Sequence, residues 1–162
     1  MFKKEEVIWA WLRISLGLVF LWAFLDKLFG LGFHTTKDKS WLLGTSPTSG
    51  FLQFGTHGPF VSIYQSLAGS ALIDWLFMLG LLFLGIALIF GIALRTAGYA
   101  GALLVFLMWL ALHPPENHPF LDEHLIYGLI LIGIANVRPI GLIGYGKSWY
   151  KNSIVKHNKI LQ

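Results

Sequence analysis

The sequence lacks cysteine and has few charged residues. Among its 162 residues there is no Cys, and Asp, Glu, Lys and Arg together make up 12%, against about 25% in a typical soluble domain. Without Cys the chain has no disulfide framework, no thiolate nucleophile and no Cys-ligated iron–sulfur cluster. Hydrophobic residues instead reach 56%, including 7 Trp and 13 Phe. This composition excludes a soluble globular enzyme, a disordered tail and a nucleic-acid-binding protein.

Four long apolar stretches run through the chain, at residues 7–29, 71–94, 96–112 and 120–137. Each is about 17 to 24 residues long, the length that a helix needs to cross roughly 30 Å of hydrocarbon. Only Arg95 separates the second stretch from the third. We therefore predict an all-α integral membrane protein, built as a bundle of four transmembrane helices. Small residues in the last three stretches, such as Gly80, Gly85 and Gly98, are typical of helices that pack closely in lipid.

The distribution of basic residues predicts the orientation of the protein. One side of the membrane carries eight Lys and Arg residues and the other side three, and the more basic side is normally cytoplasmic. Both termini are then cytoplasmic, and residues 138–162 form a basic cytoplasmic tail of a single membrane domain, 1–162. The eight cytoplasmic residues are Lys3, Lys4, Arg95, Arg138, Lys147, Lys151, Lys156 and Lys159, and the three outer ones are Lys27, Lys37 and Lys39.

The long connection after the first helix, residues 30–70, is predicted to be an ordered extracytoplasmic cap. Of its 41 residues 20 are Gly, Ser, Thr or Pro, yet it also carries six aromatic side chains, which a flexible linker does not need. Pro59 precedes apolar residues at helical spacing between Phe60 and Leu67. We therefore expect a short amphipathic helix there, lying in the membrane interface.

Titratable side chains gather on the predicted outer face. Five of the six His residues lie there with six carboxylates, while the cytoplasmic side has only Glu5, Glu6 and His157 besides its basic residues. Such groups are suited to proton transfer, so their concentration at one face indicates a functional site under the cap. The outer residues are His34, His57, His113, His118, His124, Asp26, Asp38, Asp74, Glu116, Asp122 and Glu123.

Three charged residues lie within the first stretch. Asp26 and Lys27 come at its outer end, where an ionisable pair is costly and therefore indicates function. The alternative is that Lys27 extends to the interface and Asp26 pairs with it locally. Arg13 lies about two turns from the cytoplasmic end, and we expect it to extend to the inner headgroups. Its alternative partners are the carbonyl end of a helix or Asn136.

The sequence Asp122-Glu123-His124 opens the fourth stretch. Carboxylates in a first helical turn interact favourably with the helix dipole, so helix capping is one role for them. Only 13 apolar residues follow, at 125–137, which is too few to span the membrane, so this turn should sink into the edge of the bilayer. His124 and Tyr127 then share a helix face and are candidates to meet a quinone carbonyl.

Trp109 and His113 are one helical turn apart at the outer end of the third stretch. Taken alone, Trp109 is typical of an interfacial aromatic belt and His113 of a helix end. No two outer His residues lie on one helical turn, since His113, His118 and His124 are five and six residues apart. We therefore predict no metal and no haem.

Several polar blocks resemble the DoxX/DoxD family of membrane proteins. Residues 13–17 with Trp22, and residues 26–30, resemble the family's first helix. Three further blocks are closer to the DoxD branch, namely SPTSGFL (46–52), DWLFMLG (74–80) and HPFLDEHLIY (118–127). The similarity covers residues 9–150, and its polar blocks are more specific than its apolar parts.

The resemblance implies a function and a setting. DoxD is the large membrane subunit of thiosulfate:quinone oxidoreductase, which joins two thiosulfates into tetrathionate and passes two electrons to a membrane quinone. The archaeal enzyme adds a smaller subunit, DoxA. The expected location is the plasma membrane of a prokaryote, and the expected partners are the lipid bilayer, thiosulfate, a quinone as electron-accepting substrate and a DoxA-like subunit. Because the chain has no Cys, a protein persulfide is excluded as an intermediate.

The polar blocks and the cap supply the candidate site residues. Cationic and hydrogen-bonding groups suit the thiosulfate dianion, and acid–base groups supply protons for quinone reduction. The cap is expected to exclude water. The candidates are His124, Asp122, His113 and Asp26 as catalytic residues, Lys27, Trp41, Ser46, Thr48 and His118 as substrate-binding residues, and Tyr127 and Trp109 as quinone-binding residues.

Two other functions stay open from the sequence. A non-catalytic subunit would use the cap to dock a redox partner, or would pack against a terminal oxidase. A channel or transporter is disfavoured, because the second and third stretches have almost no polar interior residues and no paired repeat of broken helices is found. Four thin helices also expose much surface, which is compatible with a homo-oligomer.

Overall fold

The computed structural model describes residues 4–116, 118–137 and 144–158. The secondary structure of these ranges consists of helices joined by loops, with no strand, which confirms the predicted all-α class. Helix α2 lies where the sequence predicts a short helix in the cap. Lys3, Arg138 and Lys159, on which the predicted orientation partly depends, lie outside the described ranges. The helices are α1 (Lys4–Phe29), α2 (Val61–Ser66), α3 (Ala71–Phe90), α4 (Leu94–Ala111), α5 (Glu123–Val137), α6 (Gly146–Lys151) and α7 (Ser153–His157).

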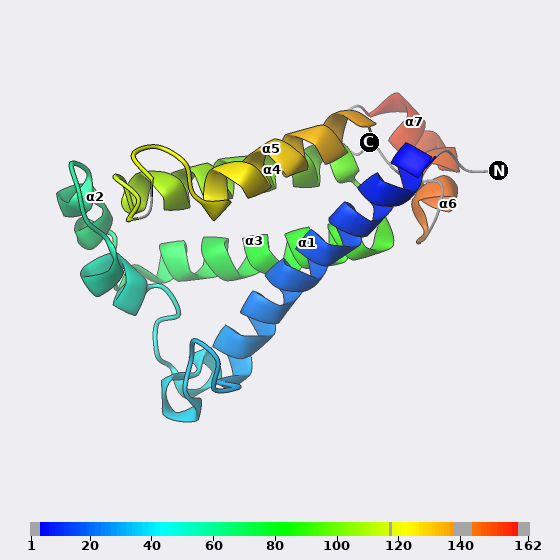
Figure 1. Cartoon of the computed structure of the whole chain (residues 1–162). Coiled ribbons are helices and arrows are strands. Elements are labelled where there is room, and N and C mark those ends of the chain that lie inside the picture. Colours follow the sequence, from blue (N-terminus) through cyan, green and yellow to red (C-terminus); the bar gives the residue numbers. More distant parts are fainter. Residues whose placement is uncertain (1–3, 117, 138–143, 159–162) are drawn as a thin grey trace.

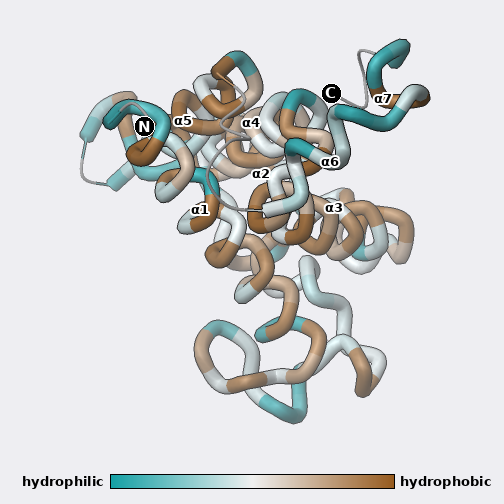
Figure 2. Tube along the Cα trace, turned by 90° about the vertical axis from the view of Figure 1, so that its right-hand side faces the viewer, coloured by the Kyte–Doolittle hydropathy of each residue, from teal (hydrophilic) through white to brown (hydrophobic). Residues whose placement is uncertain are grey.

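The long helices have the character of membrane spans. Helices α1, α3 and α4 are each long and apolar enough to cross a bilayer, so the chain is a membrane protein. Helix α5 is also apolar but has only 15 residues. Figure 2 shows hydrophobic residues along the long helices, whereas hydrophilic residues occur in α7 and in parts of the cap.

The boundary between α3 and α4 differs from the prediction. The predicted span 71–94 ends at Phe90, because Gly91 adopts the left-handed conformation with φ +74°. Its N–H donates to the carbonyl of Ala87 (2.9 Å) and closes the helix. Arg95 is therefore not the link between the two helices but part of the first turn of α4.

The long helices pack in two pairs that meet along α3 and α4. Helix α1 crosses α3, and α4 runs beside α5 (Figure 1). Toward the cap α1 leans away from α5, whereas the beginning of α1 lies at the opposite end, near α6 and α7 (Figure 1). We call the end that carries the cap the cap side. The buried core between the pairs includes Leu16, Phe20, Leu84, Leu88, Leu94 and Leu131.

Glycines allow close approach within both helix pairs, as expected for helices in lipid. A Cβ added at Gly85 of α3 would lie 2.8 Å from Leu21 of α1, and one added at Gly98 of α4 would lie 2.6 Å from Ala135 of α5. Gly80, in contrast, would have nothing within 4 Å of its Cβ. The predicted packing role therefore belongs to Gly85 and Gly98 but not to Gly80.

Arg13 does not extend to the headgroups, and that expectation is wrong. The side chain is fully buried, and its guanidinium lies against Gly91, at the end of α3 that carries partial negative charge. Asn136 is engaged elsewhere, because it donates to the carbonyl of Ile132 (2.7 Å) and accepts from Tyr99 (3.3 Å). Arg13 thus fills the junction between α1 and the carbonyl end of α3.

Hydrogen bonds hold the cap to two different helices. The buried carboxylate of Asp74, in the first turn of α3, accepts from the hydroxyls of Ser46 (2.8 Å) and Thr48 (2.5 Å). On the other side, the hydroxyl of Tyr64 in α2 donates to the carbonyl of Leu107 in α4 (2.7 Å). The cap therefore bridges the two helix pairs at the cap side.

We expect Gly98→Ala to lower the free energy of unfolding by about 1–3 kcal/mol, because the added methyl group would push α5 away from α4. Gly80→Ala is the matched control, since its methyl group meets open space and alanine favours a helix over glycine by roughly 0.5–1 kcal/mol. Thermal unfolding of both variants in the same detergent measures the difference. Equal shifts in both would contradict the packing role of Gly98.

We expect Asp74→Ala to release the cap from α3, because two hydroxyls lose an ionised acceptor and each such hydrogen bond contributes about 1.5–3 kcal/mol. The measurements are the melting temperature and the rate of limited proteolysis within 30–70. Asp38→Ala removes an exposed cap carboxylate and should change neither. A cap that stays equally protected in both variants would show that Asp74 is not its anchor.

Candidate functional site

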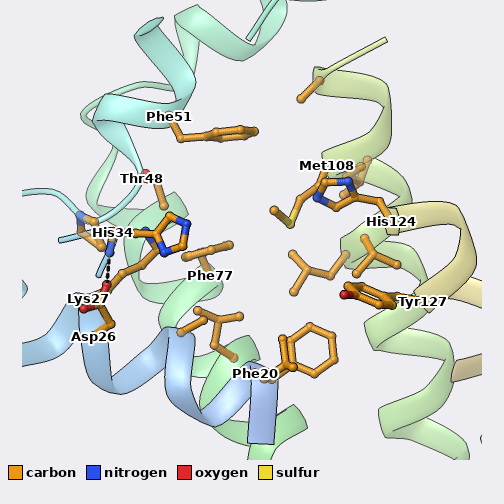
Figure 3. A pocket seen from close by; sticks show the side chains of 18 of the residues that line it. Phe20, Asp26, Lys27, His34, Thr48, Phe51, Phe77, Met108, His124 and Tyr127 are labelled. Atoms are coloured by element: carbon orange, nitrogen blue, oxygen red, sulfur yellow. Dashed lines mark hydrogen bonds between the residues drawn. The ribbon is translucent and has the colours of Figure 1, made fainter. Parts of the chain in front are cut away.

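A cavity of about 870 Å³ lies at the cap side between α1, α3, α4, α5 and the cap (Figure 3). This volume is usual for a small-molecule site. Most of the lining is apolar, and polar side chains stand mainly on two facing walls. One wall comes from the end of α1 and the cap, and the other from α5. The polar lining residues are Asp26, Lys27, His34, Thr48, Tyr64, Glu123, His124 and Tyr127.

Lys27 stands on the α1 wall, with its ammonium group 6.0 Å from the centre of the Phe77 ring. The side chain is half-buried, and no carboxylate of the described residues forms an ion pair with it. Asp26 and Lys27 therefore form no direct ion pair, although the carboxylate still interacts electrostatically with the ammonium group. A cation in this position, beside apolar side chains, is available to an anionic ligand.

Asp26 is buried and faces the backbone of the cap instead. Its carboxylate accepts hydrogen bonds from the N–H groups of Phe33 (3.2 Å) and His34 (2.9 Å). Both donors belong to the chain that leaves α1, so Asp26 orders the turn from helix to cap. The same turn brings His34 to the cavity beside Lys27 (Figure 3). The contacts of Asp26 are therefore structural, and they hold this wall of the cavity in place.

The opposite wall is built at the beginning of α5. The predicted span 120–137 begins only at Glu123, where Oδ1 of Asp122 accepts from the N–H of Leu125 (3.2 Å) and caps the helix. Oδ2 of the same carboxylate lies 2.8 Å from Nδ1 of His124. Asp122 therefore both caps α5 and orients the imidazole, which leaves Nε2 of His124 as the ring nitrogen that can meet a ligand.

His124 and Tyr127 both line the cavity, with Met108 of α4 beside them (Figure 3). The shared helix face that their spacing predicts is confirmed. Phe51 of the cap and Lys27 lie across the cavity from them (Figure 3). A flat aromatic ligand between the walls would have apolar contacts on its faces and polar groups at its edges.

The cavity also reaches the outer surface of α1. Leu18, Val19 and Trp22 line it, and they are 54%, 49% and 47% exposed. The cavity therefore opens along an exposed apolar face of α1, on the side where α1 leans away from α5 (Figure 1).

Three predicted substrate-binding residues lie outside the cavity. Trp41 packs edge-on against Trp75, with ring centres 4.7 Å apart. Ser46 donates to Asp74. Nδ1 of His118 accepts from the backbone N–H groups two and three residues after it. Each of these side chains orders the cap or a loop, and none lines the cavity.

Trp109 and His113 belong to a row of rings that holds the turn between α4 and α5. The centre of the Trp109 ring lies 4.7 Å from that of His113, which lies 6.5 Å from Phe120. The indole N–H of Trp109 donates to the carbonyl of Phe120 (2.9 Å). Nδ1 of His113 is buried without a hydrogen-bond partner in the described part of the chain. Neither ring lines the cavity.

Some cavity residues were not among the sequence candidates. His34 and Phe51 line the cavity because of the way the cap folds, which the sequence does not show. Glu123 also lines it, and the sequence analysis treated this residue only as part of a charged first turn. Tyr64 could have been identified from the sequence, because it lies on the apolar face of the predicted cap helix. Burial raises the pKa of Tyr64, so its hydroxyl keeps the proton that it donates to Leu107.

The beginning of α5 is also where metal-type donors come closest together. One donor atom each from Asp122, Glu123 and His124 lies within 4.8 Å of the others. Both oxygens of Asp122 are already engaged, one with the helix backbone and one with His124. A metal ion would have to displace one of these contacts of Asp122, and the expected absence of a metal stays a prediction.

Comparison with protein-family models, with curated proteins and with solved structures finds no match. The resemblance of the polar blocks to the DoxX/DoxD family therefore stays a prediction. The function is inferred below from those blocks and from the geometry of the cavity.

We expect Lys27→Met to leave the melting temperature unchanged or to raise it, because the substitution removes a half-buried charge that has no ion-pair partner among the described residues. Asp26→Ala should lower the melting temperature, since two backbone N–H groups lose their acceptor at about 1–3 kcal/mol each. Both melting temperatures are measured in detergent without ligand. Equal losses in the two variants would mean that Lys27 is a structural residue like Asp26.

Proposed function

We propose that this protein is a DoxD-like thiosulfate:quinone oxidoreductase, which oxidises thiosulfate to tetrathionate on the cap side and reduces a membrane quinone. The main support is the apolar cavity with Lys27 on one wall and His124, oriented by Asp122, on the other. The blocks 26–30 and 118–127, which resemble the DoxX/DoxD family, supply these two walls.

The apolar part of the cavity suits a quinone ring and the first part of its tail. A lipid-soluble quinone would enter from the bilayer along the exposed face of α1 and bind between the two polar walls of the cavity. Nε2 of His124 or the hydroxyl of Tyr127 would then donate to a quinone carbonyl. Asp122 supports this role, because its carboxylate fixes the imidazole at Nδ1 (2.8 Å) and stabilises the protonated ring.

Thiosulfate is a dianion, so its site needs cations and hydrogen-bond donors. Lys27 supplies a charge without an ion-pair partner among the described residues, and His34 supplies a ring nitrogen on the same wall. Thr48 is less suited than the sequence suggested, because its hydroxyl proton is already donated to Asp74. We therefore assign the anion site to Lys27 and His34.

Electrons and protons balance in this reaction. Two thiosulfates form one S–S bond between them and lose two electrons. The quinone takes up these two electrons and two protons and becomes the quinol. His124 delivers the protons at Nε2, and no protein sulfur forms a persulfide because the chain has no Cys.

The proposed setting is the plasma membrane of a prokaryote, with four helices in a bundle and both termini cytoplasmic. Basic residues at the end opposite the cap, Lys4, Lys147, Lys151 and Lys156, support this orientation. Helix α5 would be the fourth span. Because its 15 residues rise about 22 Å, the turn that carries His124 would lie within the edge of the bilayer.

We expect the purified protein to reduce decylubiquinone with thiosulfate, assayed with and without a DoxA-like subunit. His124→Ala should lower kcat by about 10²-fold or more, as for loss of a general acid, and Lys27→Ala should raise the KM for thiosulfate. Lys37→Ala and His157→Ala are matched controls, because they change the same residue types at exposed positions outside the cavity. Unchanged kinetics in both test variants would refute the site assignment.

A second candidate is a non-catalytic subunit that docks a redox partner through the cap. It is supported by four exposed apolar side chains of the cap, Phe33, Leu42, Leu43 and Phe54, because exposed apolar groups outside the spans favour a protein contact. A partner that co-purifies in stoichiometric amount, together with no turnover by the chain alone, would favour this candidate. Turnover by the chain alone would favour the enzyme.

A further inference from the structure

A second, smaller pocket lies beside the cavity at the cap side. It measures about 210 Å³, and polar side chains form much of its wall. Quinone reduction in the main cavity would need two protons, and apolar walls supply none, so a defined proton route to His124 is required. The smaller pocket is lined by His57, Leu112, Pro115, Glu116, Leu121, Asp122 and Glu123.

The beginning of α5 separates the two spaces. Glu123 lines both the cavity and the smaller pocket. Asp122 lines the smaller pocket, and the His124 ring that it holds lines the cavity. A carboxyl group with access to both spaces is placed to carry a proton from one to the other.

The distances allow this transfer. Donor atoms of Asp122, Glu123 and His124 lie within 4.8 Å of one another, a separation that one bridging water spans. Asp122 is less suited to carry the proton, since its two oxygens are engaged by the helix backbone and by His124. Glu123 is exposed, and its side chain has no hydrogen bond or ion pair with any described residue.

The groups around Glu123 favour delivery from the cap side. His57 and Glu116 face it in the smaller pocket, and Lys27 and His34 lie on the wall across the cavity. Toward the opposite side the core is apolar, and among the described residues the buried charged side chain in that half is Arg13. The other buried polar and charged residues of the described ranges lie at the cap side.

We infer that Glu123 is the proton relay between the cap-side water and His124, an inference that rests on the proposed quinone reduction. For each proton that Nε2 of His124 gives to the quinone, the Glu123 carboxyl passes one back to Nε2 through a water, because Nδ1 is held by Asp122. The carboxylate then takes up the next proton from the smaller pocket. Two such cycles supply the two protons of the quinol.

The test uses full-length protein in excess over decylubiquinone, so that the quinone is bound, and dithionite in place of thiosulfate. Because dithionite also reduces free quinone directly, the rate in protein-free detergent is measured as the blank and subtracted. Stopped-flow absorbance follows quinol formation. Glu123→Gln should slow it by about tenfold or more with an unchanged Kd for the quinone, and added formate, a small proton carrier, should restore the rate. Glu5→Gln is the matched control, because Glu5 is an exposed carboxyl that lines neither the cavity nor the smaller pocket, and it should behave as the wild type.

Each outcome has a distinct meaning. A slow Glu123→Gln variant that formate rescues supports the relay, whether or not thiosulfate serves as donor. A wild-type rate in Glu123→Gln, or a slow rate that formate does not restore, overturns the relay and leaves the quinone site standing. A wild-type protein that does not bind decylubiquinone overturns both. Reduction by dithionite but not by thiosulfate overturns only the proposed electron donor.

Discussion

The buried carboxylate of Asp26 is the group on which the geometry of the cavity depends. A buried carboxylate must find hydrogen-bond donors, and the nearest cation in the chain is the adjacent Lys27. Asp26 is satisfied instead by the backbone N–H groups of Phe33 and His34. This arrangement sets the direction in which the chain leaves α1, and it leaves the ammonium group of Lys27 on the cavity wall without an ion-pair partner among the described residues.

The space beside Lys27 exists because the cap is tied to both helix pairs. Asp74 holds it to α3 through Ser46 and Thr48, and Tyr64 holds it to α4 through the carbonyl of Leu107. Close packing at glycines keeps each pair together, while α1 leans away from α5 toward the cap (Figure 1). The result is a cavity covered by the cap and open along the exposed apolar face of α1.

The beginning of α5 combines a structural task with a chemical one. One carboxylate, that of Asp122, caps the helix and orients His124, so the two roles that the sequence leaves open are compatible. The turn lies between an apolar cavity and a polar pocket. In the proposed four-helix arrangement, the short length of α5 would also keep this turn near the membrane edge. Acid–base groups can thus meet a lipid-soluble substrate without a charge being placed deep in the bilayer.

By itself the sequence determined that this is an all-helical membrane protein with a short helix in an ordered cap, because apolar length and helical spacing are local properties of the chain. It also identified Lys27, His124 and Tyr127, because ionisable groups at helix ends and their spacing are visible along the chain.

Only the tertiary structure decided which polar groups share the cavity. Ser46 and Thr48 bond to a carboxylate more than twenty residues away, and Trp109 and His113 join a row of rings instead. His34 reaches the cavity only because Asp26 binds the backbone of the cap. The partner of a loop side chain depends on the path of the chain in space, and local spacing does not contain that path.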